Sequence, residues 1–210
     1  MKKIKHIICD LGGVILRTDN QKVFKSLGKY YVSSEDNVKI SIKEFLDKSF
    51  FDVFMKGLKS KEDFYYDLCY ECSLEMTFEQ FVEVFNSVHL GMNKPFARLL
   101  QKLKASGYSL HLLSNIDEIH WEDAKKKCGS VLALFENLFL SYKMHDTKPN
   151  PAIFHRVIGR ISTWPEECVF IDDSKDNIDV FRFIGGQAIL YNEKKHKEFE
   201  TKLKRILQLQ

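Results

Sequence analysis

Asp10 is the first residue in this sequence whose type and position suit covalent chemistry. It follows the apolar run 4–9 and stands just before the glycine pair Gly12-Gly13. An apolar, β-branched run that ends at a polar residue and two glycines predicts a buried strand followed by a loop. A carboxylate at that point can attack a phosphoryl group as a nucleophile. The backbone N–H groups of Leu11 and Gly12, beside the glycine pair, can bind phosphate oxygens.

Further reactive side chains follow later apolar segments. They are Ser114, Asn115, Lys148, Asp172 and Asp173. The carboxyl ends of parallel strands meet at one edge of a sheet, so we expect these residues to lie near Asp10. Carboxylates this close repel one another and need a cation, and Mg²⁺ prefers oxygen ligands. The sequence therefore predicts a Mg²⁺ site that binds a phosphate group beside Lys148.

Alternating strands and helices would bring these residues together. Strands are predicted at 4–9, 108–114, 136–141, 168–172 and 187–192. Helices are predicted from Pro95 to the stop at Gly107 and over 117–127, 151–160, 176–184 and 194–208. This order is typical of an α/β fold with a mainly parallel sheet and helices on both faces.

The stretch from residue 20 to 92 has a different, helical periodicity. Ser60 is placed to begin one helix, and Thr77 with Gln80 forms a capping box before another. No strand is predicted between residues 20 and 105. We expect an α/β core made of 1–18 and 94–210, interrupted by an all-helical insertion at 19–93.

Composition narrows the class of protein. The chain has 210 residues and a net charge of +3, too small and too evenly spread to indicate nucleic-acid binding. No apolar run approaches a membrane span. Asp10 interrupts the N-terminal apolar stretch, which argues against a signal peptide. Of the five cysteines only Cys69 and Cys72 cluster, and we interpret them as buried thiols of a cytoplasmic protein.

Four segments resemble the motifs of one family. CDLGGVIL, LLSN, TKPNPAIF and FIDDSKDN occur in the order found in the haloacid dehalogenase (HAD)-like hydrolases. The resemblance spans essentially the whole chain and identifies the insertion with the helical cap of that family. It implies a Rossmann-like core and a phosphatase that uses Mg²⁺.

The resemblance also implies a role for each matching residue. Asp10 would be the nucleophile and would bind Mg²⁺ with the Gly12 carbonyl and Asp173, while Asp172 would act directly or through a neighbour. Ser114 and Asn115 would hold the phosphate. Lys148 would neutralise charge on the phosphoryl group and on Asp10. Asn177 would support the metal or Lys148.

Gly12 departs from the common family pattern, in which a second Asp protonates the leaving alcohol. One interpretation is a phosphatase for a sugar 1-phosphate, whose anomeric hydroxyl leaves without much help, and DLGGVI is similar to the α-D-glucose-1-phosphate phosphatase branch. A second is a metal-independent 2-haloacid dehalogenase. A third is a catalytically weak member that binds a phosphorylated ligand. Asp19 is a fourth possibility as a substitute acid, though its spacing does not aim it at the site.

The insertion carries many aromatic side chains, which we interpret mainly as its own core: Phe45, Phe50, Phe51, Phe54, Phe64, Tyr65, Tyr66 and Tyr70. We expect Lys56 and Lys59 on a solvated face. We interpret His145 as a loop residue and His155 as a helix-surface residue. Substrate identity and oligomeric state are left open by the sequence, beyond a small phosphorylated molecule such as a sugar phosphate.

Overall fold

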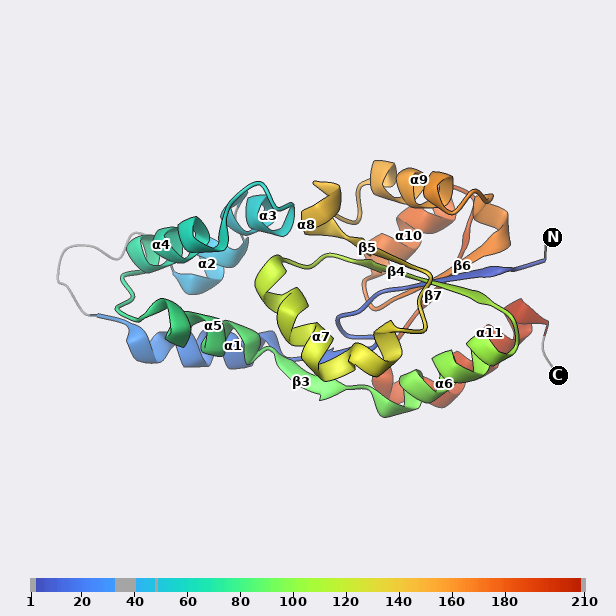
Figure 1. Cartoon of the computed structure of the whole chain (residues 1–210), viewed down its shortest axis with the longest axis horizontal. Helices are drawn as coiled ribbons and strands as arrows, with labels where there is room; N and C mark the ends of the chain where they lie inside the picture. Colours follow the sequence, from blue (N-terminus) through green and yellow to red (C-terminus); the bar gives the residue numbers. More distant parts are fainter. Residues whose placement is uncertain (1–2, 33–40, 48, 209–210) are drawn as a thin grey trace.

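A five-stranded parallel sheet forms the centre of the larger part of the computed structural model, which describes residues 3–32, 41–47 and 49–208. Its order is β5 (Asn137–Leu140), β4 (Ser109–Ser114), β1 (His6–Cys9), β6 (Cys168–Asp172) and β7 (Gln187–Leu190). All four neighbouring pairs are parallel. The sheet confirms the predicted α/β class, and it places β1 between β4 and β6 (Figure 1).

Helices cover both faces of this sheet. On one face pack α6 (Lys94–Ala105), α7 (Glu118–Leu132) and α11 (His196–Leu207), and on the other α9 (Pro151–Arg160) and α10 (Lys175–Phe183) (Figure 1). Successive strand residues point to opposite faces, so Ile7 of β1 joins the first apolar cluster and Ile8 joins the second. The two clusters form the core on the two faces of the sheet.

Short elements complete this part of the chain. They are α8 (Ser141–Met144), η2 (Pro165–Glu167) and η3 (Glu193–Lys195). The helix predicted at 194–208 is thus η3 followed by α11. The helix predicted at 117–127 continues to Leu132. The chain does not turn at Gly129, and Val131 and Leu132 continue the buried face of the helix.

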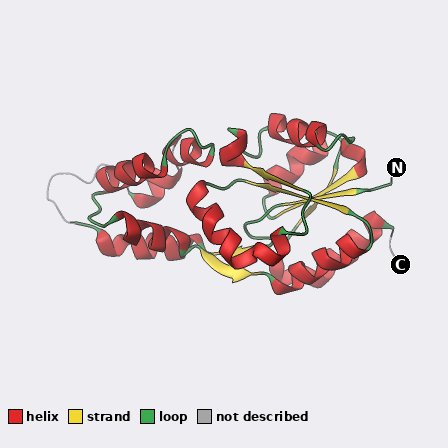
Figure 2. Cartoon of the chain, viewed as in Figure 1, coloured by secondary structure: helices red, strands yellow, loops and turns green. Residues whose placement is uncertain are grey.

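A separate group of helices forms the second part of the molecule, at the left of Figure 2. It contains α1 (Asn20–Leu27), η1 (Gly28–Tyr30), α2 (Ile42–Asp47), α3 (Ser49–Met55), α4 (Lys61–Cys72) and α5 (Phe78–Asn86). The predicted helix starts are confirmed: the Ser60 side chain caps α4, and Thr77 with Gln80 forms the capping box of α5. The predicted helical stretch also covers residues 33–40 and 48, which lie outside the described residues.

Aromatic side chains form the core of this helical group. Phe45, Phe54 and Phe64 are buried together with Phe81 and Phe85. Phe50, Phe51 and Tyr65 are half-buried against them. The interpretation as core is wrong for Tyr66 and Tyr70, which are 66% and 68% exposed on the outer face of α4. Their spacing of four residues puts both on one side of the helix, away from its neighbours.

The prediction of no strand between residues 20 and 105 is wrong at one place. His89–Met92 forms β3, which pairs antiparallel with β2 (Leu16–Thr18) in a two-stranded ribbon. The chain passes from the sheet to the helical group through β2 and returns through β3. The sequence HLGM has no apolar alternation, and pairing with a segment some 70 residues away is what makes it a strand.

The five cysteines are free thiols, all buried except Cys69, which is half-buried. Burial is the first cause that raises the pKa of the Cys69 thiol, to about 11. The prediction of buried thiols is therefore confirmed for Cys72, whereas Cys69 is half-buried. Among the described residues, no helix combines the length and apolar character that crossing a membrane requires.

Candidate active site

The three central strands end together, and each ends at a polar residue. Asp10 follows β1, Ser114 is the last residue of β4, and Asp172 is the last residue of β6. The Asp10 N–H donates to the Ile171 carbonyl at 2.9 Å, which extends the pairing of β1 with β6 to the carboxylate itself. All three residues are buried. The topology therefore brings residues from distant parts of the sequence to one edge.

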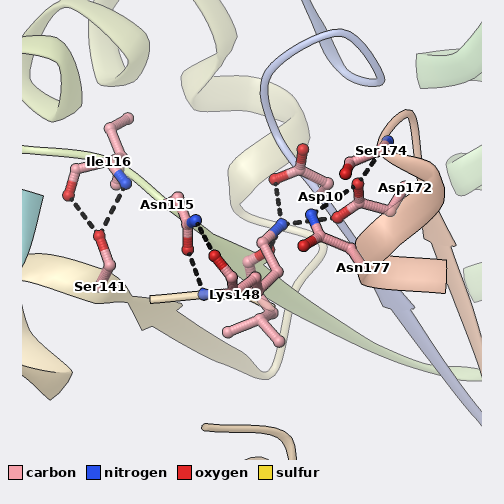
Figure 3. A network of polar contacts seen from close by, with 9 residues as sticks. Asp10, Asn115, Ile116, Ser141, Lys148, Asp172, Ser174 and Asn177 are labelled. Atoms are coloured by element: carbon pink, nitrogen blue, oxygen red, sulfur yellow. Dashed lines mark hydrogen bonds and ion pairs between the residues drawn. The ribbon is translucent and has the colours of Figure 1, made fainter. Parts of the chain in front are cut away.

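Lys148 lies at the centre of this group, in the loop between α8 and α9. Its Nζ is 2.8 Å from Asp10 Oδ1, 2.7 Å from Asp172 Oδ2, and donates to the Leu113 carbonyl at 2.9 Å. Three acceptors thus match the three N–H bonds of an ammonium group. Figure 3 shows the side chain pointing between the two carboxylates. With 4% exposure, Lys148 is held as a cation because both carboxylates raise its pKa against the effect of burial.

The Asn115 side chain fixes the backbone of Lys148. Asn115 Nδ2 donates to the Lys148 carbonyl and Asn115 Oδ1 accepts from the Lys148 N–H, both at 2.8 Å (Figure 3). Both ends of the amide are therefore engaged in holding the lysine. Since the side chain of Asn115 is occupied, its backbone N–H is a better candidate for the predicted contact with phosphate than its side-chain amide. This N–H lies next in the chain to the buried Ser114.

Asp172 is a fully buried carboxylate with a partner on each oxygen. Its Oδ1 accepts from the Ser174 N–H at 2.8 Å and from Asn177 Nδ2 at 3.0 Å, while Oδ2 accepts from Lys148. Asn177 is predicted to support the metal or Lys148. In the structure its side chain donates to Asp172, which is a carboxylate partner of Lys148. These bonds orient Asp172 toward Lys148.

Asp10, Asp172 and Asp173 form a group of carboxylates with one oxygen from each lying within 4.8 Å of the others. Burial raises the pKa of Asp10 to about 7, and the charges of Asp172 and Asp173 add to that effect although Lys148 opposes it. The pKa of Asp173 is also raised, by lost hydration and by Asp172. One ammonium is too little charge for three carboxylates. The oxygen donors and their excess negative charge fit a hard divalent cation such as Mg²⁺.

The loop after Asp10 approaches this group closely. Gly13 has a φ of +68°, and a Cβ there would lie 1.9 Å from Asp173 Oδ2, so only glycine fits. Gly12 differs, since a Cβ would meet nothing nearer than Thr18 Cγ2 at 3.8 Å. Leu11 is buried in the core, and its carbonyl accepts from the N–H groups of Val14, Ile15 and Leu16. Any contact of Leu11 with substrate would therefore come from its backbone.

Asn93 is a buried residue that sequence reasoning missed. Its Nδ2 donates to the Val14 carbonyl at 2.9 Å and to the Tyr191 hydroxyl at 2.8 Å, and its Oδ1 caps α6. Its N–H donates to the Ile15 carbonyl at 2.8 Å. Asn93 thereby fixes the loop that follows Asp10. The available signal was an Asn two residues before Pro95, which is the pattern of a helix N-cap.

Ser141 is a second such residue, and it joins the two parts of the molecule. The Oγ accepts from the Ile116 N–H at 2.8 Å and lies 2.7 Å from the Met55 carbonyl of α3. Ile116 follows Asn115 in the loop after β4 (Figure 3). No motif marks Ser141, because its partners come from separate segments of the sequence.

The remaining candidates lie elsewhere. Lys56 and Lys59 form ion pairs with Asp52 and Asp67 of the helical group, rather than standing on an unpaired solvated face. His145 lies in the turn after α8 with its Nδ1 2.9 Å from the Lys56 carbonyl.

Two further residues keep the positions expected of them. His155 is an exposed residue of α9. Asp19 is exposed and caps α1 by accepting from the Gln21 N–H.

Comparison with known proteins gives matches over most of the chain. Residues 4–185 match the family model described as haloacid dehalogenase-like hydrolase. Among curated proteins, the chain is 28% identical to D-ribitol-5-phosphate phosphatase of Bacteroides thetaiotaomicron, over 88% of this chain and 90% of that protein.

Solved structures show the same similarity. A HAD family enzyme of Bacteroides thetaiotaomicron, crystallised with magnesium and inorganic phosphate, has a TM-score of 0.77 and 29% identity, covering 90% of this chain and 95% of that one. A HAD-like hydrolase of Porphyromonas gingivalis has a TM-score of 0.81 at 23% identity over the full length of both chains, which shows a shared fold.

Proposed function

The chain belongs to the haloacid dehalogenase-like hydrolases, and from this premise we propose that it is a Mg²⁺-dependent phosphatase that acts through an aspartyl-phosphate on Asp10. The substrate we propose is a small sugar or polyol phosphate. The observation that carries the proposal is Lys148 Nζ, placed 2.8 Å from Asp10 Oδ1 in a buried site that also holds Asp172 and Asp173.

Asp10 supplies the nucleophile in this proposal. A carboxylate oxygen of Asp10 forms a bond to phosphorus while the bond from phosphorus to the substrate oxygen breaks. Lys148 stands beside the attacking carboxylate and offsets the negative charge that gathers on the phosphoryl oxygens. Attack by water on the aspartyl-phosphate then releases inorganic phosphate and restores Asp10.

Residues around the carboxylates would hold the cation and the phosphate. Asp10, Asp173 and the Gly12 carbonyl would bind Mg²⁺, which when bound supplies positive charge to the phosphoryl oxygens. Asp172 contributes its charge through Lys148. The Ser114 hydroxyl and the backbone N–H groups of Leu11, Gly12 and Asn115 would hold the phosphate.

Gly12 limits the choice of leaving group. No carboxylic acid stands at that position to protonate the departing oxygen, a contribution of roughly 10²–10⁴ in rate where it exists. A leaving hydroxyl of low pKa, such as an anomeric one, depends least on such an acid. The family membership and the ribitol phosphate phosphatase relative support a small phosphorylated polyhydroxy compound.

The helical group supports the substrate assignment by its position. We propose that residues 19–93 act as a cap on a core made of 1–18 and 94–210. Ser141, Thr147 and His145 of the core contact Met55, Asp52 and Lys56 of the helical group, so the two parts meet beside the loops that carry Ser114 and Lys148. A closed cap of this kind excludes water from the site and selects the leaving group by shape.

Phosphate release from a defined panel tests the proposal. The purified protein with Mg²⁺ should hydrolyse at least one of glucose 1-phosphate, glucose 6-phosphate and ribitol 5-phosphate. The Asp10→Asn variant should lose roughly 10³-fold or more in kcat, because an amide is a poor nucleophile. Substitution of the exposed His155 by Gln provides the matched control and should leave kcat unchanged.

Two results would contradict the proposal. One is turnover that survives in Asp10→Asn, which removes the nucleophile assignment. The other is the absence of phosphate release from every member of the panel, combined with metal-independent halide release from 2-chloropropionate, which would indicate dehalogenase chemistry instead.

A further inference from the structure

A second cluster of titratable side chains lies outside the active site, where α7 meets the end of the helical group. Asp117 caps α7, and His120 belongs to its first turn. His89 of β3 packs beside His120 with ring centroids 5.0 Å apart. Asp123 and Lys127 follow along α7 and pair with His89 and with each other. The cluster spans the boundary between the two parts of the molecule.

His120 has a hydrogen-bond acceptor at each ring nitrogen. Nδ1 is 2.5 Å from Asp117 Oδ2, and Nε2 is 3.1 Å from the carbonyl of Phe85 in α5. A carboxylate and a carbonyl are both acceptors. A neutral imidazole has one N–H and can satisfy one of these acceptors, whereas an imidazolium donates to both. The geometry thus favours a doubly protonated ring.

Asp117 has the contacts of a carboxylate at a helix N-terminus. Its Oδ1 accepts from the His120 backbone N–H at 2.9 Å, in the position of a helix N-cap. The positive end of the helix dipole stabilises a carboxylate at that place. Asp117 is completely buried, and a buried carboxylate needs a cation, which the imidazolium of His120 provides.

The neighbouring groups shift the pKa values of the two histidines in opposite directions. Burial lowers the pKa of His120, but the charge and hydrogen bond of Asp117 raise it above its ordinary value. Burial and the nearby His120 lower the pKa of His89 to about 4, although Asp123 opposes this. His89 is therefore neutral, with Nδ1–H donating to Asp123 at 2.7 Å. Lys127 supplies the cation for Asp123.

His120 joins the active-site loop to the helical group. Asp117 comes three residues after Ser114, and Ile116 between them is held by Ser141. On the other side, the ring stacks on Phe85 at 4.1 Å and donates to its carbonyl. The same ring lines a small apolar cavity of about 140 Å³. The residues around that cavity are Asn20, Val23, Phe24, Phe51, Phe85, Val88 and His120.

We propose that His120 is a positioning residue, whose imidazolium is held by Asp117 and docks α5 onto the loop after β4. Its contacts are with Asp117, Phe85 and His89, and not with Lys148 or the carboxylates beside it, so its effect on reaction would pass through the placement of the cap over the substrate. The kinetic consequence rests on the phosphatase function proposed above. The protonation state of His120 and the docking of α5 do not depend on that function.

The protonation state is tested in the unmodified protein by NMR of ¹⁵N- and ¹³C-labelled histidine, with His120→Gln used to assign the His120 signals. At pH 7.5 the His120 ring should show the shifts of an imidazolium, at a pH where a free imidazole is largely neutral. A neutral His120 ring at that pH would overturn the proposal, whether or not the protein hydrolyses any phosphate.

The docking role is tested by hydrogen–deuterium exchange on folded His120→Gln, with His155→Gln as the control. Exchange of the amides at 85–92 and 115–120 should be roughly tenfold faster in His120→Gln, because a hydrogen bond from a charged donor is lost. Unchanged exchange in both segments rejects the docking role without reference to turnover.

Kinetics distinguish positioning from a general loss of structure. With the sugar or polyol phosphate that the panel identifies, His120→Gln should raise KM about tenfold and change kcat little. With acetyl phosphate, whose leaving group is too small to need the cap, KM and kcat should stay within about twofold of the unsubstituted protein. An equal loss on both substrates indicates a merely structural role and contradicts the proposal.

Discussion

At the scale of single residues, two adjacent glycines are subject to opposite constraints. Gly13 adopts a left-handed φ and lies against Asp173, so any side chain there would displace a carboxylate of the proposed metal site. Gly12 is not among the glycines of positive φ, and a Cβ there would make only an ordinary contact with Thr18 Cγ2 at 3.8 Å. The backbone therefore does not demand a glycine at position 12.

Substitution of Gly12 by Asp should add a proton donor to the site without disturbing the fold. We expect kcat on a primary-alcohol phosphate such as glucose 6-phosphate to rise, by up to about 10²-fold, since an acid at this position can protonate the leaving oxygen. For an anomeric phosphate the rise should be smaller. Steady-state phosphate release on both substrates measures the difference.

Gly12→Ala is the matched control for that substitution, because it adds the Cβ without the acid. Its kcat should stay near that of the unsubstituted protein, and its unfolding midpoint should match that of Gly12→Asp. Equal kcat values for the Ala and Asp variants on every substrate would show that position 12 does not face the leaving group.

The reactive side chains could be predicted from the sequence because each stands at the end of an apolar run. Asp10, Ser114 and Asp172 follow strands, and parallel strands end at one edge. Their supporting partners could not be predicted in that way. Asn115 binds the backbone of Lys148, and Asn93 binds Val14, so each contact depends on which distant loops the sheet brings together.

At the scale of elements, Asn93 links the loop after Asp10, the return strand β3 and the start of α6. Its side chain bonds Val14, Tyr191 and Phe96, and its backbone bonds Ile15. The prediction of helix α6 from Pro95 was accurate because caps and proline act locally. The prediction for β3 failed because a short ribbon depends on a partner strand far away in the sequence.

Asn93→Ala should therefore destabilise the protein more than the loss of an ordinary helix cap. It removes the α6 cap, takes the donor from the buried Val14 carbonyl and leaves the Tyr191 hydroxyl with His196 alone, which together should lower the free energy of unfolding by about 2–4 kcal/mol. Asp19→Ala removes an exposed cap of α1 and should cost about 1 kcal/mol. Urea unfolding of both variants gives the comparison, and equal losses would mean that the Val14 and Tyr191 bonds contribute nothing.

At the scale of the whole molecule, the active-site edge holds more negative charge than the protein itself compensates. The net charge of the chain is +3, yet three carboxylates lie together at this edge, and Lys148 pairs with two of them, Asp10 and Asp172. Burial raises the pKa of Asp10 to about 7. Without a metal, the folded protein therefore favours the protonated form of Asp10. The free energy of unfolding of the metal-free protein falls as Asp10 ionises.

The sign of this effect predicts how stability varies with pH. A carboxyl whose folded pKa is raised contributes stability that is fully present below its ordinary pKa, near 3.8, and that is lost as pH rises through about 7. Without metal, the difference in unfolding free energy between the unsubstituted protein and Asp10→Asn should fall between pH 4 and pH 7. The Asn variant cancels from the comparison the titration of groups that lie away from Asp10.

Mg²⁺ should reverse this trend, because a bound cation stabilises the ionised form of Asp10. At a free concentration 100 times its Kd it should add about 2.7 kcal/mol to the free energy of unfolding of the unsubstituted protein. Its affinity should rise as pH increases toward 7, since proton and metal compete for the same oxygens. Thermal unfolding with and without Mg²⁺ at several pH values measures both effects. A Mg²⁺ shift that is equally large in Asp173→Asn and in the unsubstituted protein would place the cation somewhere other than this edge of the sheet.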